Sequence, residues 1–520
     1  MIKDKEEIDK NLKLIAKSSF VILFGLVFSK ILTYTYRVII ARNFGPEIYG
    51  LFSISTMLFG WFVLFASFGF SEGLLRYIPW YIGKRDYKKI NFIFKTSILI
   101  SIVSGILSGI LLFFLAEYIS ISFFHNKELI IFLKVFSFLI PFFLLNSLFL
   151  SVLQSFGKIN WYSFIVNIFQ NIIKVFAIIL LVIISFKTNA IIISYLLSIV
   201  FMFFLSYYVC RSSIPGLFER IDITTSEKKK SFLDFFSYSW PLLFSVAMAE
   251  IFFWIDSLLI GYFNGVVDVG LYNVAVPIVL FLMITPEIFL KLFFPIITRE
   301  FSNNKKEVVK QLSQQVGKWI FLLNLPLFLI MFIFPGIMIN ILFGSQYLSA
   351  FNALRILSIG GFISSLTWIS YSLLSMAGKS KAIFWNILIA SGINILLGIF
   401  FIPKYGINGA ALSTTLSKFI LAIILFSKVK KELNIFPFRK KIIQILLLSL
   451  VPTTIVLYLR SIFKINFITL ILVGILFILI YLLLIFLTNA LDKNDFMVLK
   501  SIKNKLLPQI KIKKLFEPLF

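Results

Sequence analysis

Long runs of apolar residues, separated by short polar turns, make up most of the chain. A helix needs about 20 apolar residues to cross the hydrocarbon of a bilayer, and fourteen runs reach that length. Their boundaries are 18–40, 51–71, 92–115, 129–153, 162–184, 188–209, 237–262, 271–296, 316–337, 351–376, 382–402, 406–427, 442–460 and 467–488. No run shows the alternation of a membrane β-barrel, and helices satisfy their own backbone in lipid. The pattern predicts an all-α polytopic membrane protein with about 14 transmembrane helices.

A short motif, Gly-x4-Gly-Leu-aromatic, follows the first run at 45–52 and the seventh run at 265–272. Two further pairs of segments match at nearly the same offset of about 220 residues. These are Gly157-Lys158 with Gly378-Lys379, and 189–198 with 408–417. We therefore interpret runs 1–6 and 7–12 as two copies of a six-helix unit. Because six crossings return the chain to its starting side, the repeats are parallel, with a cavity expected between two V-shaped lobes.

The repeat gives the predicted domain boundaries. We expect an N-terminal lobe at 1–209, a basic linker at 210–236, a C-terminal lobe at 237–430, and two extra helices with a basic tail at 431–520. The loops on the side opposite the termini are short, which leaves no room there for a separate folded domain.

Composition and charge support a membrane location. Hydrophobic residues make up 60% of the 520, and the mean hydropathy is +0.99. The net charge of +27 would suggest nucleic acid in a soluble protein. Here about 35 Lys and Arg residues fall on the side of the termini and about 6 on the other, which is typical of the cytoplasmic side of a cell-membrane protein. We expect membrane lipids as neighbours, cytoplasmic termini and no nucleic-acid partner.

One Cys and one His leave little for disulfides, imidazole metal sites or His-based catalysis. We expect no metal site, no cofactor and no enzymatic activity.

Three sequence segments together resemble a known family. "ARNFGPEIYGLFSIS" with "GFSEGLLRYIP" (69–79), "WIDSLLIGYFNGVVDVGLYNVA" (254–275) and "PKYGINGAALSTTLS" (403–417) are similar to polysaccharide-type flippases of the multidrug/oligosaccharidyl-lipid/polysaccharide exporter superfamily. Phe44 stands where the family pattern has Leu. The resemblance covers about residues 15–430 and implies two lobes that open alternately inward and outward. It also implies a lipid-linked oligosaccharide as substrate, and glycan-assembly enzymes as candidate partners.

Basic and amide residues lie within spans of the first lobe. A charge in the hydrocarbon costs at least about 2.5–3.5 kcal/mol, so each requires a reason. Lys30 and Arg37 share one face of the first span with Thr33 and Tyr34. The fifth span has a second polar stripe of Asn167, Gln170, Asn171 and Lys174. With the resemblance, these stripes predict a cavity in which cations hold the (pyro)phosphate of a polyprenyl-linked glycan and amides bind its sugars. Pairing with carboxylates inside the bundle is the rival interpretation.

Acidic residues lie in the second lobe, where Glu250, Asp256 and Glu287 are candidates for coupling transport to Na+ or H+. Glu250 and Asp256 are about 240° apart around their helix and cannot share a face. Ion pairing between the lobes is the alternative role of these two acids. Glu287 precedes Lys291 by four residues, so local neutralisation is its alternative role. Arg355, at the outer end of the tenth span, is either a substrate-binding gate residue or an interfacial anchor.

The predicted function is a flippase that moves a lipid-linked oligosaccharide from the cytoplasmic to the outer leaflet. A multidrug exporter on the same scaffold is a rival, although basic stripes do not suit cationic drugs. A peptidoglycan-precursor flippase is a second rival. A membrane glycosyltransferase or polymerase is a third, and the short outer loops disfavour it.

Overall fold

The computed structural model describes residues 2–219, 224–439, 441–462 and 466–488. Within these ranges the chain is helical and contains no strand. The predicted basic tail lies outside the described residues. The first helices are α1 (Ile2–Ala66), α2 (Phe70–Gly83), α3 (Tyr87–Tyr118), α4 (Leu129–Ser155), α5 (Ile159–Ser163), α6 (Gln170–Ile183) and α7 (Asn189–Ser213). The later helices are α8 (Thr225–Phe263), α9 (Val266–Leu280), α10 (Ile284–Ser302), α11 (Lys306–Ile333), α12 (Pro335–Phe343), α13 (Phe351–Met376), α14 (Ser380–Leu433), α15 (Lys441–Ile462) and α16 (Phe467–Leu487).

Short π or 3-10 turns lie between several of these helices. They are η1 (Ile119–Phe123), η2 (Phe164–Phe169), η3 (Pro215–Leu217), η4 (Phe281–Met283) and η5 (Ser345–Ala350). The predicted fifth span is therefore built from α5, η2 and α6, and the predicted eighth span from α9, η4 and α10.

Twelve helical segments in the described ranges are long and apolar enough to cross a membrane. Two of them are interrupted by glycines with positive φ, Gly45 in α1 (φ 82°) and Gly406 in α14 (φ 55°). Glycine adopts these angles without the steric penalty of a side chain. Counting the two halves of each interrupted helix separately gives fourteen apolar segments. The prediction of an all-α polytopic membrane protein with about 14 transmembrane helices is confirmed.

The start of the seventh span differs from its prediction. Helix α8 begins at Thr225, whereas the apolar run begins at 237. The charged first turns of α8 are helical because they pack beside α2. Phe70 of α2 and Phe235 of α8 are in ring contact there, with 5.4 Å between the ring centres. Pro241 lies inside this helix and separates the part beside α2 from the part beside α9 and α14.

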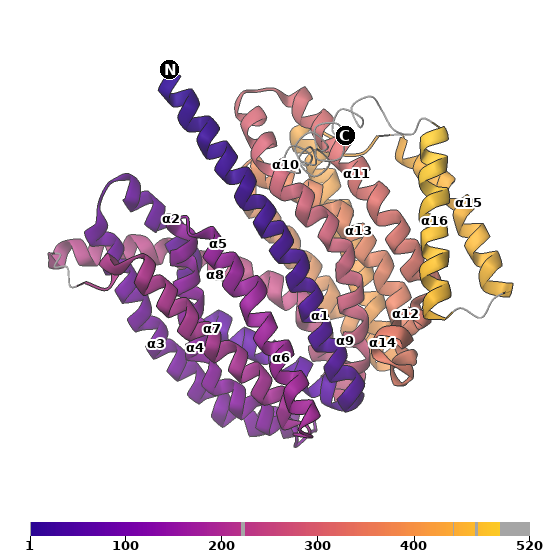
Figure 1. Cartoon of the computed structure of the whole chain (residues 1–520), viewed down its shortest axis with the longest axis horizontal. Coiled ribbons are helices and arrows are strands. Elements are labelled where there is room, and N and C mark those ends of the chain that lie inside the picture. Colours follow the sequence, from indigo (N-terminus) through magenta and orange to yellow (C-terminus); the bar gives the residue numbers. More distant parts are fainter. Residues whose placement is uncertain (1, 220–223, 440, 463–465, 489–520) are drawn as a thin grey trace, which may run out of the picture.

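Helices α1–α7 form one group in Figure 1, and α9–α14 form a second group beside it. One buried apolar cluster is shared by both groups and contains, for example, Ile40 and Leu133 of the first and Ile278 and Leu354 of the second. A second cluster, around Phe94, is confined to α2–α8, and a third, around Ile369, is confined to α10–α14 and the segment just after it. The groups thus share a core at one end and have separate cores at the other.

The shared end contains the two copies of the Gly-x4-Gly motif, and we call it the turn end. Gly45 and Gly265 have nearly the same conformation, with φ of 82° and 91° and ψ of 178° at both. Gly50 and Gly270 then bring their backbones together. A Cβ on Gly50 would overlap the carbonyl oxygen of Val266, and a Cβ on Gly270 would overlap that of Pro46. The repeated motif is therefore the contact by which the two groups meet.

Polar contacts reinforce the turn end. The Tyr347 hydroxyl donates a hydrogen bond to the Ala41 carbonyl oxygen (3.0 Å). The Arg42 guanidinium donates to the carbonyl oxygens of Ile341 and of Leu342 (2.9 Å for Leu342). These carbonyls belong to the last turn of α12, where helical carbonyls lack intrahelical partners and a cation is favourable.

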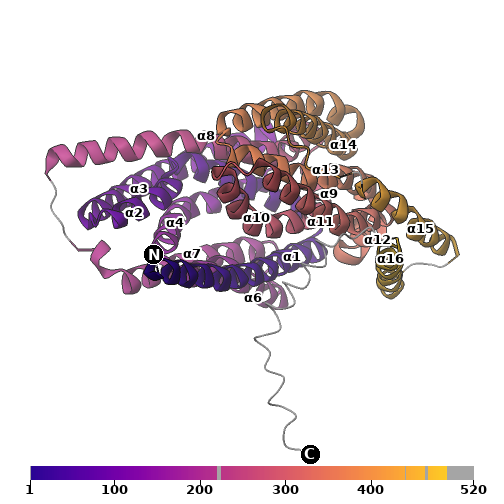
Figure 2. The same ribbon diagram turned by 90° about the horizontal axis from the view of Figure 1, so that it is seen from above.

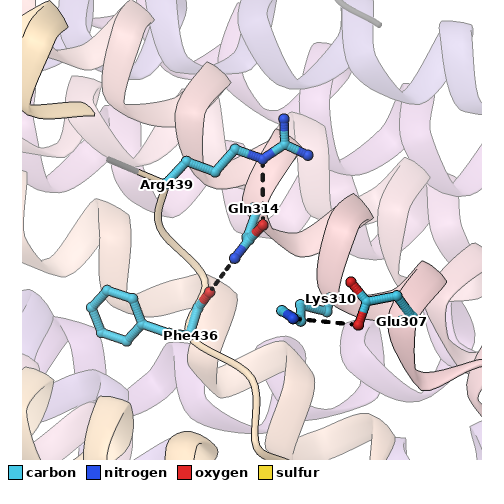
Figure 3. Close-up of polar contacts among 5 residues, drawn as sticks. All are labelled: Glu307, Lys310, Gln314, Phe436 and Arg439. Atoms are coloured by element: carbon cyan, nitrogen blue, oxygen red, sulfur yellow. Dashed lines mark hydrogen bonds and ion pairs between the residues drawn. The ribbon is translucent and has the colours of Figure 1, made fainter. Parts of the chain in front are cut away.

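Helices α15 and α16 pack outside the second group, as Figure 2 also shows from above. The segment that leads to α15 is tied to α11. Gln314 Nε2 donates to the Phe436 carbonyl oxygen (3.1 Å), and Arg439 Nε donates to Gln314 Oε1 (3.3 Å). Figure 3 shows these bonds beside the Lys310–Glu307 pair on α11. The extra helices are therefore fixed to the second group rather than to the interface between groups.

The glycine contact gives a direct test of the turn end. Gly50→Ala and Gly270→Ala should each lower the melting temperature of the purified protein in detergent, because the new methyl group must displace backbone atoms. Gly60→Ala is the matched control, since a Cβ there meets nothing within 4 Å and alanine favours helix by about 0.5–1 kcal/mol. Equal melting temperatures for Gly50→Ala and Gly60→Ala would contradict the contact.

Candidate functional site

A small cavity of about 100 Å³ lies between α1 and the helices α8, α9, η4 and α10 of the second group. The polar face of α1 lines it with Lys30, Thr33, Tyr34 and Arg37. These residues are spaced at three and four positions, so the helix presents them on one side. The opposite wall is mainly apolar. The structure therefore brings Lys30 and Arg37 to one cavity at the interface of the groups.

Arg37 is held by a chain of hydrogen bonds that crosses this interface. Its Nη1 donates to the Tyr49 hydroxyl oxygen (3.2 Å), and that hydroxyl donates to the carbonyl oxygen of Asn273 in α9 (3.1 Å). Tyr49 is fully buried and belongs to the first Gly-x4-Gly motif. The motif that joins the groups thus also positions the cavity arginine.

Lys30, Arg37 and Lys174 form no ion pair with a carboxylate among the residues that the structure describes. Lys174 and Arg37 are close enough to interact electrostatically, and two cations repel each other. The buried hydroxyl of Tyr34 has no hydrogen-bond partner among the residues that the structure describes. The described contacts therefore give no support to the rival interpretation of internal carboxylate pairing, and they leave a polar, positively charged site able to attract an anion.

Lys174 lies within the first group, between two aromatic rings. Its Nζ is 5.5 Å from the centre of the Tyr36 ring and 5.3 Å from that of Tyr195. At these distances the ring faces attract the ammonium and partly replace its water. Lys174 does not line the small cavity but lies behind α1.

The amides of the same stripe contact α1. Thr33 donates to Asn171 Oδ1 (3.1 Å), and Asn171 Nδ2 donates to the Ser29 hydroxyl oxygen (3.1 Å). Asn167 Nδ2 donates to Ser163 (3.0 Å), while Gln170 is partly exposed. Asn167 and Asn171 are both buried, and the Asn171 bonds hold α1 against α6. A role in binding sugars stays a prediction.

Asp256 is the centre of a buried polar cluster in the second group. It is 4% exposed and accepts hydrogen bonds from α9 and from both halves of α14. The donors are the hydroxyl of Tyr272 (2.9 Å), Nδ2 of Asn394 (3.1 Å) and the hydroxyl of Thr414. Oδ1 of Asn394 remains unpaired among the described residues. The cluster has two kinds of oxygen that can bind a cation, carboxylate and amide.

Lys418 and Asp256 line one further cavity of about 310 Å³, between α8, α9, α13 and α14. They interact electrostatically, although the pair is not within ion-pair distance. Lys418 is a further charged residue of a membrane span, and the structure places it beside the buried acid.

The two repeats use equivalent positions to build two clusters of opposite charge. The paired positions, offset by 219 or 220, are Tyr36 with Asp256, Lys174 with Asn394, and Tyr195 with Thr414. In the first group these positions surround an ammonium with rings. In the second they surround a carboxylate with hydrogen-bond donors.

The remaining predicted residues lie apart from the Asp256 cluster. Glu250 is exposed on α8 and interacts with the Trp254 ring nitrogen, so it lies beside a residue of the α1 cavity. Glu287 lines a separate groove with Trp368, and the side chain of its predicted partner Lys291 lies outside the described residues. Arg355 donates to the Phe332 carbonyl oxygen (3.1 Å) and is not among the residues that line the α1 cavity.

Sequence reasoning missed Tyr49, Tyr272, Asn394 and Thr414. All four are uncharged, so no desolvation cost drew attention to them. The signal available was the repeat: Asn394 and Thr414 occupy the positions equivalent to Lys174 and Tyr195. Tyr49 lies within the first copy of the motif, and Tyr272 is the final residue of the second.

The chain is similar to known families. A family model described as "Polysaccharide biosynthesis protein" matches residues 15–301, and a second, MatE, matches 241–400. An uncharacterized membrane protein of Methanocaldococcus jannaschii is 28% identical over 470 residues, covering 88% of this chain and 92% of that protein. The "Putative O-antigen transporter" of Shigella flexneri is 26% identical over 429 residues, covering 79% and 96%.

Among solved structures, the lipid II flippase MurJ in an inward closed conformation aligns with a TM-score of 0.70 and 20% identity. The alignment covers 89% of this chain and 98% of that one. At this identity the likeness shows the fold, which is the MurJ/MATE-like arrangement of membrane helices.

The Asp256 cluster predicts a difference between two acids on one helix. Asp256→Ala should lower the melting temperature in detergent, because three buried donors lose their acceptor at on the order of 1–3 kcal/mol each. Asp256→Asn should lower it less, since one acceptor oxygen remains. Glu250→Ala is the control and should stay near the wild type because Glu250 is exposed. If Asp256→Ala and Glu250→Ala had the same melting temperature, the Asp256 cluster would not stabilise the fold.

Proposed function

The chain belongs to the polysaccharide biosynthesis protein family, and we propose that this multi-pass transporter flips a polyprenyl-(pyro)phosphate-linked oligosaccharide across the cell membrane. The observation that carries the proposal is the α1 cavity, where Lys30 and Arg37 lie without carboxylate partners in the described residues. An anionic headgroup needs cations to replace its water and counter-ions, and arginine can bind two phosphate oxygens at once. No bond is made or broken in this process.

The proposed orientation places the termini and the basic loops in the cytoplasm. The turn end then faces outward, and the end with separate cores faces the cytoplasm. Figure 1 is consistent with this arrangement, since the first and second groups diverge toward the end at which the N-terminus lies. In this state the substrate headgroup reaches the cavity from the cytoplasm.

Transport then requires the turn end to separate while the cytoplasmic ends approach. The contacts to be broken are backbone packing at Gly50 and Gly270 and hydrogen bonds such as Tyr347 to Ala41. The charged residue among the turn-end contacts, Arg42, is exposed, so the turn end can open without leaving a buried charge unpaired. We propose that the two groups alternate in this way around the cavity.

Asp256 is the proposed coupling residue. The carboxylate and the unpaired Oδ1 of Asn394 supply oxygen atoms for a cation, and Lys418 supplies a positive charge in the cavity beside them. Binding of Na+ or H+ would change the balance of charge between Asp256 and Lys418. Because Asp256 is on α8 and Lys418 is on α14, a change in this balance would alter the packing of the two helices, and an ion gradient could drive that change.

A precursor of peptidoglycan is a second candidate substrate, because its pyrophosphate-linked carrier presents the same anion to the cavity, and the fold is shared with a lipid II flippase. Export of cationic drugs is less compatible with Lys30 and Arg37. Both alternatives are separated by the choice of substrate in the assay below.

The cavity residue Arg37 and the neighbouring buried cation Lys174 can be tested by reconstitution. Arg37→Gln and Lys174→Gln should each reduce translocation of a fluorescent polyprenyl-pyrophosphate oligosaccharide in liposomes by about 10-fold or more, the loss expected for a charged hydrogen bond of about 1.5–3 kcal/mol. Lys404→Gln is the control, since Lys404 is exposed and packs over Phe400 outside the cavity. Wild-type rates in both the Arg37 and the Lys174 variant would overturn the site. Transport of a cationic drug, or of a peptidoglycan precursor alone, would favour the alternatives.

Coupling can be tested in the same liposomes. An imposed Na+ or proton gradient should accelerate wild-type translocation, and Asp256→Asn should remove the acceleration while leaving slow equilibration of substrate, because the variant cannot change its charge. Glu250→Gln and Glu287→Gln identify whether other acids contribute. If neither gradient affects the wild type, the coupling proposal fails and the substrate proposal is unaffected.

A further inference from the structure

A second basic site shares no residue with the α1 cavity. It lies in a groove of about 730 Å³ between α2 and the first half of α8. Helix α2 follows the second membrane segment, and the start of α8 lies within the predicted basic linker (210–236). On the proposed orientation, the groove lies at the cytoplasmic boundary of the membrane. It is therefore positioned beside lipid headgroups rather than along the path between the groups.

The α2 wall combines cations with aromatic rings on one helical face. Arg76, Trp80 and Lys84 follow at intervals of four residues. The guanidinium carbon of Arg76 is 3.9 Å from the centre of the Tyr238 ring on α8, and Lys84 Nζ is 4.7 Å from that of Trp80. Such contacts orient a cation while leaving its N–H groups able to bind an anion.

Lys230 adds a cation from the α8 wall. In the described part of the chain, no carboxylate pairs with Arg76, Lys84 or Lys230. Two acids also line the groove. Glu227 accepts a hydrogen bond from the Thr224 hydroxyl (2.7 Å), and Asp234 has its backbone oxygen bound to the Tyr77 hydroxyl (2.9 Å). A ligand thus meets three unpaired cations against two acids.

The neighbouring ion pair does not change this balance. Lys89 lines the groove and is paired with Asp86 at 2.8 Å. Arg85 and Lys88, in the same turn, are exposed and do not line the groove, although they add to the positive potential around it.

We propose that the α2–α8 groove binds the phosphate of a lipid on the cytoplasmic side of the membrane. Trp80 is 56% exposed and provides the amphipathic surface that suits the headgroup region. Arg76, Lys84 and Lys230 bind the phosphate oxygens, while the acyl or polyprenyl chain stays in the leaflet. The source is either an anionic phospholipid or a polyprenyl phosphate, since both present the same group. The site does not depend on the proposed transport substrate.

Native mass spectrometry of the purified full-length chain in neutral detergent tests the groove. The probes are dioleoylphosphatidylglycerol, a polyprenyl phosphate, dioleoylphosphatidylcholine and inorganic phosphate. Arg76→Gln with Lys84→Gln should weaken binding of phosphatidylglycerol 10-fold or more. Arg85→Gln with Lys88→Gln removes the same charge from the adjacent turn and should change binding less than twofold. The charge-conserving pair Arg76→Lys with Lys84→Arg should bind nearly as the wild type does, which excludes misfolding as the cause.

Equal binding of phosphatidylglycerol and the polyprenyl phosphate supports the site with a membrane phospholipid as its source. Preference for the polyprenyl phosphate supports it with a carrier lipid as its source. Three results would overturn the site: equal losses in the two Gln pairs, equal binding of phosphatidylcholine, or displacement of the lipid by inorganic phosphate at equal concentration. Substitutions of Arg37 and Lys174 should leave phosphatidylglycerol binding unchanged, so this test and the transport test fail independently.

Discussion

The backbone contact between Gly50 and Gly270 is the constraint on which the arrangement of the two helix groups depends. With no side chain at either position, the segments after Gly45 and Gly265 approach until their peptide groups touch. The shared apolar cluster surrounds this contact, whereas the cores at the other end are separate. Tyr49 precedes the first glycine of the contact and holds Arg37 in the adjacent cavity. The same few residues therefore join the groups and position the basic site.

The repeats build clusters of opposite charge from equivalent sequence positions. Lys174 lies between Tyr36 and Tyr195, and the equivalent positions in the second repeat form the cluster of Asp256, Asn394 and Thr414. The Lys174 ammonium has no carboxylate partner among the described residues and can still attract an anion. A buried carboxylate, in contrast, can bind a mobile cation. This difference agrees with the proposed roles of the two groups: the first binds an anionic substrate, and the second binds the coupling Na+ or H+.

Most of the fold could be predicted from the sequence because the lipid environment makes apolar length a direct signal of a crossing helix. The offset of 220 residues likewise indicated the repeat, and the structure shows why its motif is polar: glycines are needed where backbones touch. The early start of α8 was missed because its first turns are charged and are stabilised by packing against α2. Tertiary contacts of that kind leave no hydrophobic periodicity to read.

The candidate site was only partly accessible to the same reasoning. Lys30 and Arg37 were identifiable because a charge in a membrane span is costly. Tyr49 and Asn394 were not, because their importance depends on partners more than 100 residues away. Arg355 was identified by its charge in the same way, but the structure places it against the Phe332 carbonyl of α11 and not among the residues that line the α1 cavity.

In the proposed cycle the turn end opens during transport. A direct measurement places spin labels at Asn43→Cys and Ser345→Cys, both exposed beside the turn-end contacts, after replacing Cys210 with Ser. In liposomes without substrate, pulsed electron resonance should give a single short distance. With a lipid-linked oligosaccharide and an ion gradient, a second, longer distance should appear, and Arg37→Gln should reduce its population. A single unchanged distance during measured translocation would contradict the account.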